Sequence, residues 1–218
     1  MPGFADLAAT ADPPLDRLAL ALAAEFRDVD EAGTLAALDA LGEELAEAVA
    51  AVPGTPEGQC AACARVLGRT HGFAGDTREY DDPDNSMLDL VVERRRGLPI
   101  LLSVVYVEVA RRAGVPLRGV GLPGHFVVGH VEETPPLLID PFSGGAFVET
   151  DASAAMRRPW DAHETAMRML NNLVGAYQRR GDLGRALRAA ALRLDLPAAP
   201  ELRKDLETEL RSMRARLN

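Results

Sequence analysis

The sequence predicts an α+β fold, in which a buried central helix packs on a small antiparallel sheet and further helices flank this core. Apolar residues recur every three or four positions before residue 70 and again after residue 162, which is the spacing of amphipathic helices. A nearly continuous apolar helix is expected at 100–110. Four short β-prone segments bounded by turn residues follow it, and helices followed by a run of strands favour separate helical and sheet layers.

Helices fill the N-terminal third of the chain. Two apolar stripes mark them, Leu15, Leu18, Leu22 and Phe26 in the first helix and Leu35, Leu38, Leu41, Leu45 and Val49 in the second. A break at Pro53 and Pro56 precedes a third helix, expected at 57–70. Ser86 with Asp89 three positions later has the pattern of a capping box, so a short helix is expected to start there.

The central helix is apolar on nearly all sides. Pro99 suits its first turn, because the N–H group that proline lacks would be unpaired there anyway. Between 100 and 110 only Ser103 and Glu108 are strongly polar, and a helix that is apolar all round belongs in the interior. Gly114 is placed to end it.

Strands are expected at 117–122, 125–131, 137–140 and 146–149. From about Ala162 the chain returns to helix, with apolar stripes at Met167, Leu170, Val174 and Tyr177, at Leu183, Ala186, Leu187, Ala190 and Leu194, and at Leu202, Leu206, Leu210, Met213 and Leu217. We interpret residues 1–161 as an α+β domain that includes the N-terminal helices, and 162–218 as a helical extension packed on it.

The extension has one feature of a repeat. Tyr177, Gly181 and Ala186 have the offsets of a tetratricopeptide helix pair. A repeat array needs about three such units, so we prefer simple packing on the core, with a peptide-binding groove as the alternative.

Length and charge restrict the classes of function. A chain of 218 residues can bury about 70% of the surface that its unfolded form exposes. The net charge of −9 argues against binding to nucleic acid or to an anionic membrane surface. The longest apolar run, 98–107, is about half a membrane span, and no secretory signal is visible at the N-terminus. A cytoplasmic protein is therefore expected.

The cysteines are Cys60 and Cys63. Such a pair can be redox-active or can form half of a zinc site, for which His71 is the only nearby histidine. Their helical spacing beside Val66 and Leu67 also fits two small hydrophobic residues on a helix face, which is the interpretation we prefer.

A possible reaction centre lies between residues 97 and 142. The start of the apolar helix carries partial positive charge, which favours a thiolate at that position in thiol enzymes. His125 and Asp140 fall on strands that can be neighbours, and a carboxylate behind an imidazole fixes its tautomer. His130 would face the other side of its strand. The alternative is a purely structural pairing of His125 with Asp140.

Several segments together carry a family resemblance. They are Tyr80-Asp81-Asp82-Pro83, Asn85-Ser86, Glu93-Arg94-Arg95-Arg96-Gly97-Leu98-Pro99, Gly119-Val120-Gly121-Leu122-Pro123-Gly124-His125-Phe126 and Ile139-Asp140-Pro141-Phe142. The chain resembles the bacterial SirB-type branch of the transglutaminase-like superfamily over about residues 15–218, including the tail around 168–173. The resemblance implies a transglutaminase-like, papain-related core and implies little about activity.

The resemblance also locates a missing nucleophile. Thiol members carry their cysteine two residues after the glycine that opens the helix, and this position is Pro99 here. His125 and Asp140 match the other two triad positions. Ser103, one turn further along and roughly 6 Å deeper, is the candidate substitute, although its hydroxyl can equally bond a carbonyl of the preceding turn.

Two hypotheses follow from this pattern. The leading one is a non-catalytic domain that binds a peptide or protein segment in the cleft beside the His125 strand. Its ligand-binding candidates are Tyr80, Asn85, Arg95, Arg96 and Pro99, since an anion such as a peptide carboxylate suits a basic segment at a helix start. The alternative for this basic segment is a solvated surface.

The rival hypothesis is a hydrolase or acyl transferase in which His125 acts as the general base and Asp140 orients it. Zinc held by this pair alone would lack a third protein ligand, so no metal or cofactor is expected. The oligomeric state is not predicted by the sequence.

Overall fold

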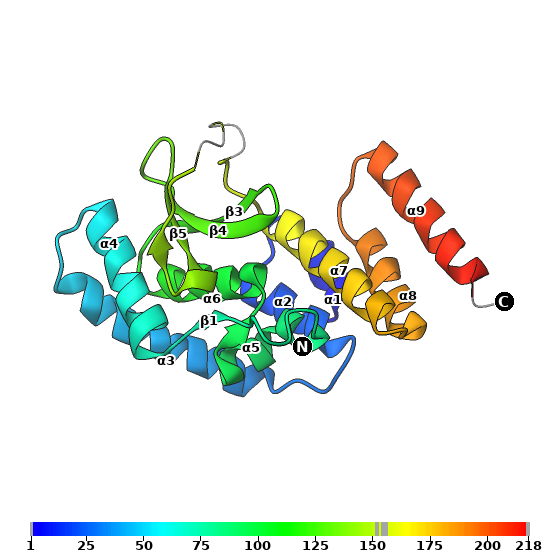
Figure 1. The fold of residues 1–218 in the computed structure, drawn as a ribbon, viewed down its shortest axis with the longest axis horizontal. Coiled ribbons are helices and arrows are strands. Elements are labelled where there is room, and N and C mark those ends of the chain that lie inside the picture. Colours follow the sequence, from blue (N-terminus) through cyan, green and yellow to red (C-terminus); the bar gives the residue numbers. More distant parts are fainter. Residues whose placement is uncertain (1, 151–152, 154–156, 217–218) are drawn as a thin grey trace.

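Helix α6 (Pro99–Arg112) lies between the sheet and the N-terminal helices in the computed structural model, which describes residues 2–150, 153 and 157–216 (Figure 1). Every residue of α6 from Pro99 to Ala110 is buried, including Ser103 and Glu108. Pro99 occupies the first turn, and Gly114 follows the helix at a φ of 73°, a backbone conformation that glycine adopts without strain. The predicted central helix and the α+β class are thus confirmed.

The N-terminal helices cover the side of α6 that faces away from the sheet (Figure 1). They are α1 (Phe4–Ala8), α2 (Leu15–Ala24) and α3 (Glu31–Ala50), whereas the next helix, α4 (Pro56–Cys63), lies against α3 and beside the sheet. Side-chain caps start two of them, because Asp30 accepts from the Gly33 N–H and Thr55 accepts from the Gly58 N–H. The third predicted helix differs in its second half, where the chain continues as a π-helix, η1 (Ala64–Thr70).

Antiparallel strands form the sheet in the order β3 (Leu117–Leu122), β4 (His125–His130), β5 (Leu137–Asp140) and β6 (Ala146–Phe147). The register sets Leu122 opposite His125 and Asp140 opposite Ala146. Phe126, Val128 and Ile139 face the main core, whereas Val120, Val127 and Leu138 form a smaller cluster on the outer face. A short parallel pair is formed by β1 (Ala74–Gly75) and β2 (Arg96–Gly97); both strands contact α6, and β2 directly precedes it in the sequence.

The expected capping box at Ser86 is wrong. The 3₁₀ turn η2 (Pro83–Ser86) precedes α5 (Leu88–Arg94), so Met87 takes the N-cap position. The Ser86 hydroxyl is buried without a hydrogen-bond partner among the described residues, and Asp89 pairs with Arg27 instead. Asp82 caps the 3₁₀ turn, and Ser86 is the last residue of this turn rather than the N-cap of α5.

The C-terminal extension consists of α7 (Ala162–Arg179), α8 (Leu183–Leu192), η4 (Arg193–Asp195) and α9 (Pro200–Ala215). A capping box starts α7, formed by Asp161 and Glu164. Helix α7 packs on α2, α6 and η2, while α9 contacts α8 and η4 at the far end (Figure 1).

Two predicted members of the extension's apolar stripes are exposed. Leu183 has 36% and Leu202 has 44% of its surface accessible, because each lies at the outer start of its helix. Leu217 lies outside the described residues. Among the described residues, no helix combines the length and apolar character needed to cross a membrane.

Candidate functional site

The start of α6 presents a proline ring where the resemblance places a nucleophile. Leu98 is the N-cap residue, and its N–H donates to the carbonyl of Asn85 at 3.0 Å. Pro99 follows as the first helical residue and is buried. A pyrrolidine ring offers neither a nucleophilic atom nor an N–H donor. This helix start therefore lacks the group that would attack a carbonyl in a thiol enzyme.

His125 and Asp140 are brought together at one end of the sheet. The Nε2 atom of His125 lies 3.1 Å from Oδ1 of Asp140, with 33% of the histidine side chain and 12% of the aspartate side chain exposed. A carboxylate only accepts hydrogen bonds, so this contact favours a proton on Nε2 and leaves Nδ1 as the basic nitrogen. Asp140 can therefore hold the imidazole of His125 in one orientation and one tautomer.

The Asp140 carboxylate is held from within its own turn. Its Oδ1 accepts from the Phe142 N–H at 2.9 Å, and its Oδ2 accepts from the Ser143 hydroxyl at 2.7 Å. Both donors belong to the 3₁₀ turn η3 (Pro141–Ser143), for which Asp140 is the N-cap. The local turn therefore fixes the carboxylate before any ligand arrives.

Aromatic side chains extend the site toward solvent. The His125 ring meets Phe142 edge-on at 6.4 Å between centroids, and Phe142 meets Tyr80 edge-on at 6.1 Å. The Phe142 ring lies against Gly75, where an added Cβ would come within 2.2 Å of it. Glycine at this position is what lets the ring approach. Tyr80 at the end of the row is 49% exposed.

The loop that carries Tyr80 is tied down on its inner side. Asp76 accepts from the N–H groups of Arg78 and Glu79, and these bonds, the Glu79 bond first, lower the pKa of its carboxyl. The buried Asn85 amide donates to the Glu79 carbonyl at 2.8 Å and to Asp76 at 3.3 Å. Asn85 therefore supports the site from below, where it is inaccessible to a ligand.

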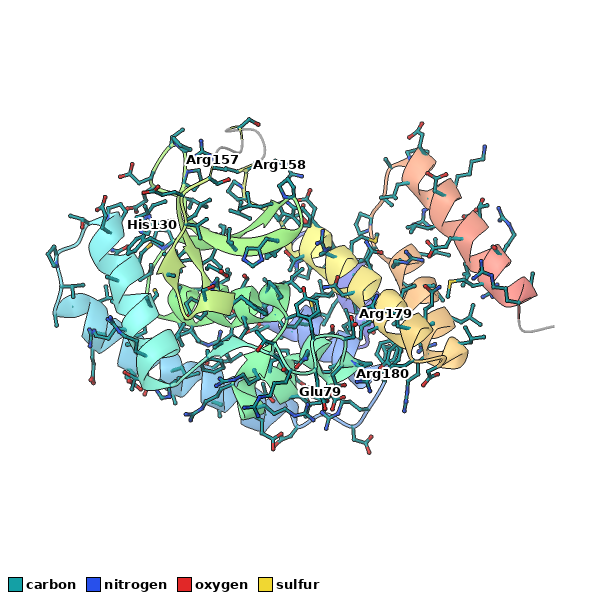
Figure 2. The ribbon with its side chains drawn as sticks, viewed as in Figure 1. Glu79, His130, Arg157, Arg158, Arg179 and Arg180 are labelled. Atoms are coloured by element: carbon teal, nitrogen blue, oxygen red, sulfur yellow. The ribbon has the colours of Figure 1, made fainter. Side chains whose placement is uncertain are left out.

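Ion pairs tie the same loop to the extension on its outer side. At the end of α7, Arg179 lies 2.5 Å from Asp81, and Arg180 lies 3.5 Å from Asp82 (Figure 2). Beside them a cavity of about 120 Å³ opens between Tyr80 and Leu98 on one wall and α7 on the other. The end of the sheet, the start of α6 and the extension thus meet around Tyr80.

The basic segment before α6 is used within the protein. Arg94 pairs with Asp84 at 2.6 Å. Arg95, at a φ of 58°, donates to the His71 carbonyl at 3.1 Å, and Arg96 donates to the Gly72 carbonyl. The guanidinium groups of Arg95 and Arg96 fasten the 71–72 turn, and no described contact links them to His125.

The alternative nucleophiles are enclosed. The Ser103 hydroxyl is buried and has no hydrogen-bond partner among the described residues. Cys60 and Cys63 are free and buried on α4, and burial raises the pKa of each thiol to about 12. No cluster of three or more His, Cys, Asp or Glu side chains suited to a metal ion occurs in the described part of the chain.

His130 lies on the opposite side of the strand from His125, as the alternation of the strand predicts. It is fully buried at the α4 end of the sheet, and its Nε2 lies 2.7 Å from the Gln59 side-chain oxygen (Figure 2). Burial lowers its pKa, so the neutral ring joins α4 to the sheet.

Comparison with known proteins places this geometry in a family. A sequence profile of the transglutaminase-like superfamily matches residues 32–187, from α3 into α8. The chain belongs to the transglutaminase-like superfamily. No solved structure matches it.

This transglutaminase-like chain is similar to curated proteins along part of its length. A UPF0162 protein of Xylella fastidiosa strain 9a5c is 37% identical over 164 residues, which cover 66% of this chain and 58% of that protein. A UPF0162 protein of Pseudomonas aeruginosa is 37% identical over 87 residues, 40% of this chain and 32% of its own. F-box only protein 21 of Mus musculus is 41% identical over 56 residues, 26% of this chain and 9% of its own. The chain thus spans 58% of the length of the Xylella relative.

Sequence reasoning missed two parts of the transglutaminase-like site. One is Ser143, whose hydroxyl supports Asp140; the signal was a serine three residues after an aspartate at a turn, which is a local capping pattern. The other is the tie between Arg179 and Asp81, which joins residues 98 positions apart and leaves no local pattern.

Proposed function

We propose that this chain is a non-thiol, SirB-type member of the superfamily that binds a peptide or protein segment beside His125 and serves a regulatory or scaffolding role. The observation that carries the proposal is Pro99 at the start of α6, buried and without a nucleophilic atom. With Ser103, Cys60 and Cys63 enclosed, the described residues around the site favour recognition over covalent chemistry.

The row of aromatic rings supports binding. Tyr80 is exposed, and rings with one wet and one apolar face are frequent anchors in protein interfaces. His125 adds a hydrogen-bonding nitrogen at the inner end of the row. Because Asp76 and Asn85 already hold the Tyr80 loop, little ordering would be required when a ligand arrives.

We assign the 162–218 extension a tetratricopeptide-like character, based on the α7–α8 hairpin and the turn at Gly181, whose φ is 73°. A cytoplasmic, bacterial setting is part of the same proposal, and the bacterial relatives support the bacterial part of it.

A specific observation favours one alternative, a hydrolase or acyl transferase that uses an activated water. Asp140 is held by Phe142 and Ser143, and no described residue hydrogen-bonds to Nδ1 of His125. In this scheme Nδ1 takes a proton from water, the resulting hydroxide attacks a carbonyl, and the imidazolium returns the proton to the leaving group. A catalytic triad that has lost its nucleophile accelerates the reaction only about 10³–10⁴-fold relative to the uncatalysed reaction in water.

Selection of a random peptide library displayed on phage tests the two functions. We expect selected peptides whose dissociation constant rises at least tenfold in Tyr80→Ala and in His125→Ala, because each removes a contact that is buried in the complex. Leu202→Ala, an exposed change on α9, is the matched control and should leave affinity unchanged.

Selected peptides that bind equally well to both site variants would overturn the proposed binding site. Rapid hydrolysis of fluorogenic peptide amides that disappears in His125→Ala would overturn the non-catalytic function and support the alternative.

A further inference from the structure

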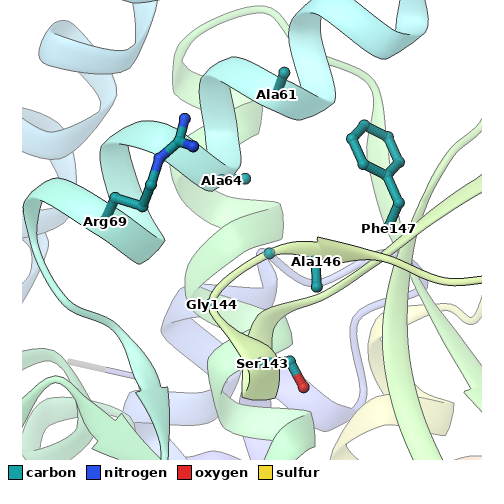
Figure 3. A pocket seen from close by; sticks show the side chains of 8 residues that line it. Ala61, Ala64, Arg69, Ser143, Gly144, Ala146 and Phe147 are labelled. Carbon is teal, nitrogen blue, oxygen red and sulfur yellow. The ribbon is translucent and has the colours of Figure 1, made fainter.

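A groove of about 350 Å³ lies between α4–η1 and the edge strand β6 (Figure 3). It begins at Ser143, whose hydroxyl holds the Asp140 oxygen that His125 does not contact. Its floor is made of small residues, Ala61 and Ala64 from the helix and the Gly144–Gly145 turn from the sheet side. The rings of His125, Phe142 and Tyr80 do not line this groove.

The backbone keeps this groove open. An added Cβ at Gly145 would come within 2.7 Å of Ala64, and one at Gly68 would come within 2.0 Å of the Gly144 carbonyl oxygen. The turn and the π-helix η1 are therefore in direct main-chain contact. π-helical turns are rare in proteins, and those that occur often lie at functional sites. Tight packing of backbone on backbone leaves a floor without side chains long enough to fill it.

The edge strand offers an apolar ring and main-chain groups that point away from the sheet, for which the described residues show no partner. Phe147 is 52% exposed and stands on one side of Ala64 (Figure 3). The Val148 N–H donates to the Leu138 carbonyl, so alternation along the strand turns the N–H and C=O of Phe147 away from β5. An exposed edge of this kind is a template for an added strand.

The opposite side of the groove carries a positive charge. Arg69 lies across Ala64 from Phe147 (Figure 3). In the described part of the chain its guanidinium has neither a hydrogen bond nor an ion pair, in contrast to Arg95 and Arg96. A guanidinium fork at the end of an apolar surface is complementary to a carboxylate.

We propose that this groove binds the C-terminal end of a partner peptide whose last side chain is apolar. Such a residue carries a carboxylate and an apolar side chain on one Cα atom, which fits a short groove with Arg69 on one side and Phe147 on the other. The carboxylate binds Arg69, the side chain lies on the Ala61–Ala64 floor against Phe147, and the peptide backbone pairs with the free edge of β6. An internal acidic residue carries its charge on its own side chain, so a second residue of the peptide would have to supply the apolar contact.

Titration of ¹⁵N-labelled protein with acetylated tripeptides that end in Leu, Val, Ile or Phe tests this binding mode. Each peptide is used as the free acid and as the C-terminal amide. We expect saturable shifts of the Arg69, Ala61 and Phe147 amides with the free acid, and at least tenfold weaker binding of the amide, because a hydrogen bond to a charged group is lost.

Substitutions separate the groove from general charge effects. Arg69→Gln should weaken binding of the free-acid peptide about as much as amidation of the peptide does. Ala61→Phe should block the groove. Arg65→Gln is the matched control, since Arg65 is exposed one helical turn earlier and does not line the groove. His125→Ala should bind the tripeptides normally, so failure of this proposal is distinguishable from failure of the site beside His125.

Several results would overturn the proposal. They are equal affinity for acid and amide, equal loss in Arg65→Gln and Arg69→Gln, or no shift at the groove with any of the peptides. Concentration-dependent dimerisation that Ala61→Phe abolishes would also overturn it, because the groove would then be an interface between two copies of this chain.

Discussion

Replacing Gly68 by alanine should destabilise the protein, although alanine is the better helix former. Its new Cβ would lie 2.0 Å from the Gly144 carbonyl oxygen, so the 143–145 turn must retreat by about 1.4 Å to reach the 3.4 Å at which ordinary contact begins. Overpacking of this kind typically costs about 1–3 kcal/mol, while the gain in helix propensity is about 1 kcal/mol or less. Because the obstructing atom belongs to backbone, we expect the cost to lie at the upper end of this range, about 3 kcal/mol, which leaves a net loss of about 2 kcal/mol.

The matched control is Gly175→Ala in α7. There the added Cβ meets a terminal nitrogen of Arg179 at 3.1 Å, and a shift of a few tenths of an ångström in this long side chain removes the overlap. The propensity gain should then dominate, and the free energy of unfolding should rise by about 0.5–1 kcal/mol. The two substitutions are chemically identical and are expected to have opposite signs.

Urea unfolding followed by circular dichroism measures both variants. With an m-value of about 3 kcal/mol/M, the midpoint of Gly68→Ala should fall by about 0.7 M. The backbone shift should also reach Ser143 and therefore change the amide chemical shifts of η3. A Gly68→Ala protein as stable as the wild type would refute the claim that the π-helix and the turn are in rigid contact.

Further predictions concern buried ionisable groups. Burial, followed by the neighbouring Asp16 charge, raises the pKa of Glu108, so the folded state keeps a proton that the unfolded state releases as pH rises. The stability of wild type relative to Glu108→Gln should therefore fall as pH rises above the ordinary glutamate pKa of 4.5 in urea unfolding experiments, and a relative gain would contradict this assignment. Cys60 and Cys63, each with a pKa raised to about 12, should not react with a thiol reagent at neutral pH until urea unfolds the chain; prompt labelling of the native protein would show that α4 opens.

The main features of the fold could be predicted from local patterns. The apolar run after Pro99 predicted the buried helix, and alternation predicted β3 and β5 with their observed bounds, because both signals depend on neighbouring residues alone. The capping pattern at Ser86 failed because Asp82 starts a competing turn upstream. The π-helical half of 57–70 contacts Gly144, which lies far along the chain, so the surroundings of this segment cannot be read from its local pattern.

The candidate site was only partly accessible to sequence reasoning. The juxtaposition of His125 and Asp140 followed from strand order. The arginines before α6 were expected to face a ligand, but a left-handed residue at Arg95 turns the chain, and their guanidinium groups reach the 71–72 carbonyls instead. Which partner a long flexible side chain selects depends on the tertiary surroundings, and periodicity carries no information about these.

Helix α7 connects the two halves that the sequence suggested as separate units. Met169, Leu170 and Leu173 belong to the main core, while Arg179 and Arg180 hold Asp81 and Asp82, the two residues that follow Tyr80. The extension is therefore not an exchangeable module. Removing it would leave the Tyr80 loop without its outer anchors, and a sequence change in the last turn of α7 would loosen a loop almost a hundred residues earlier in the chain.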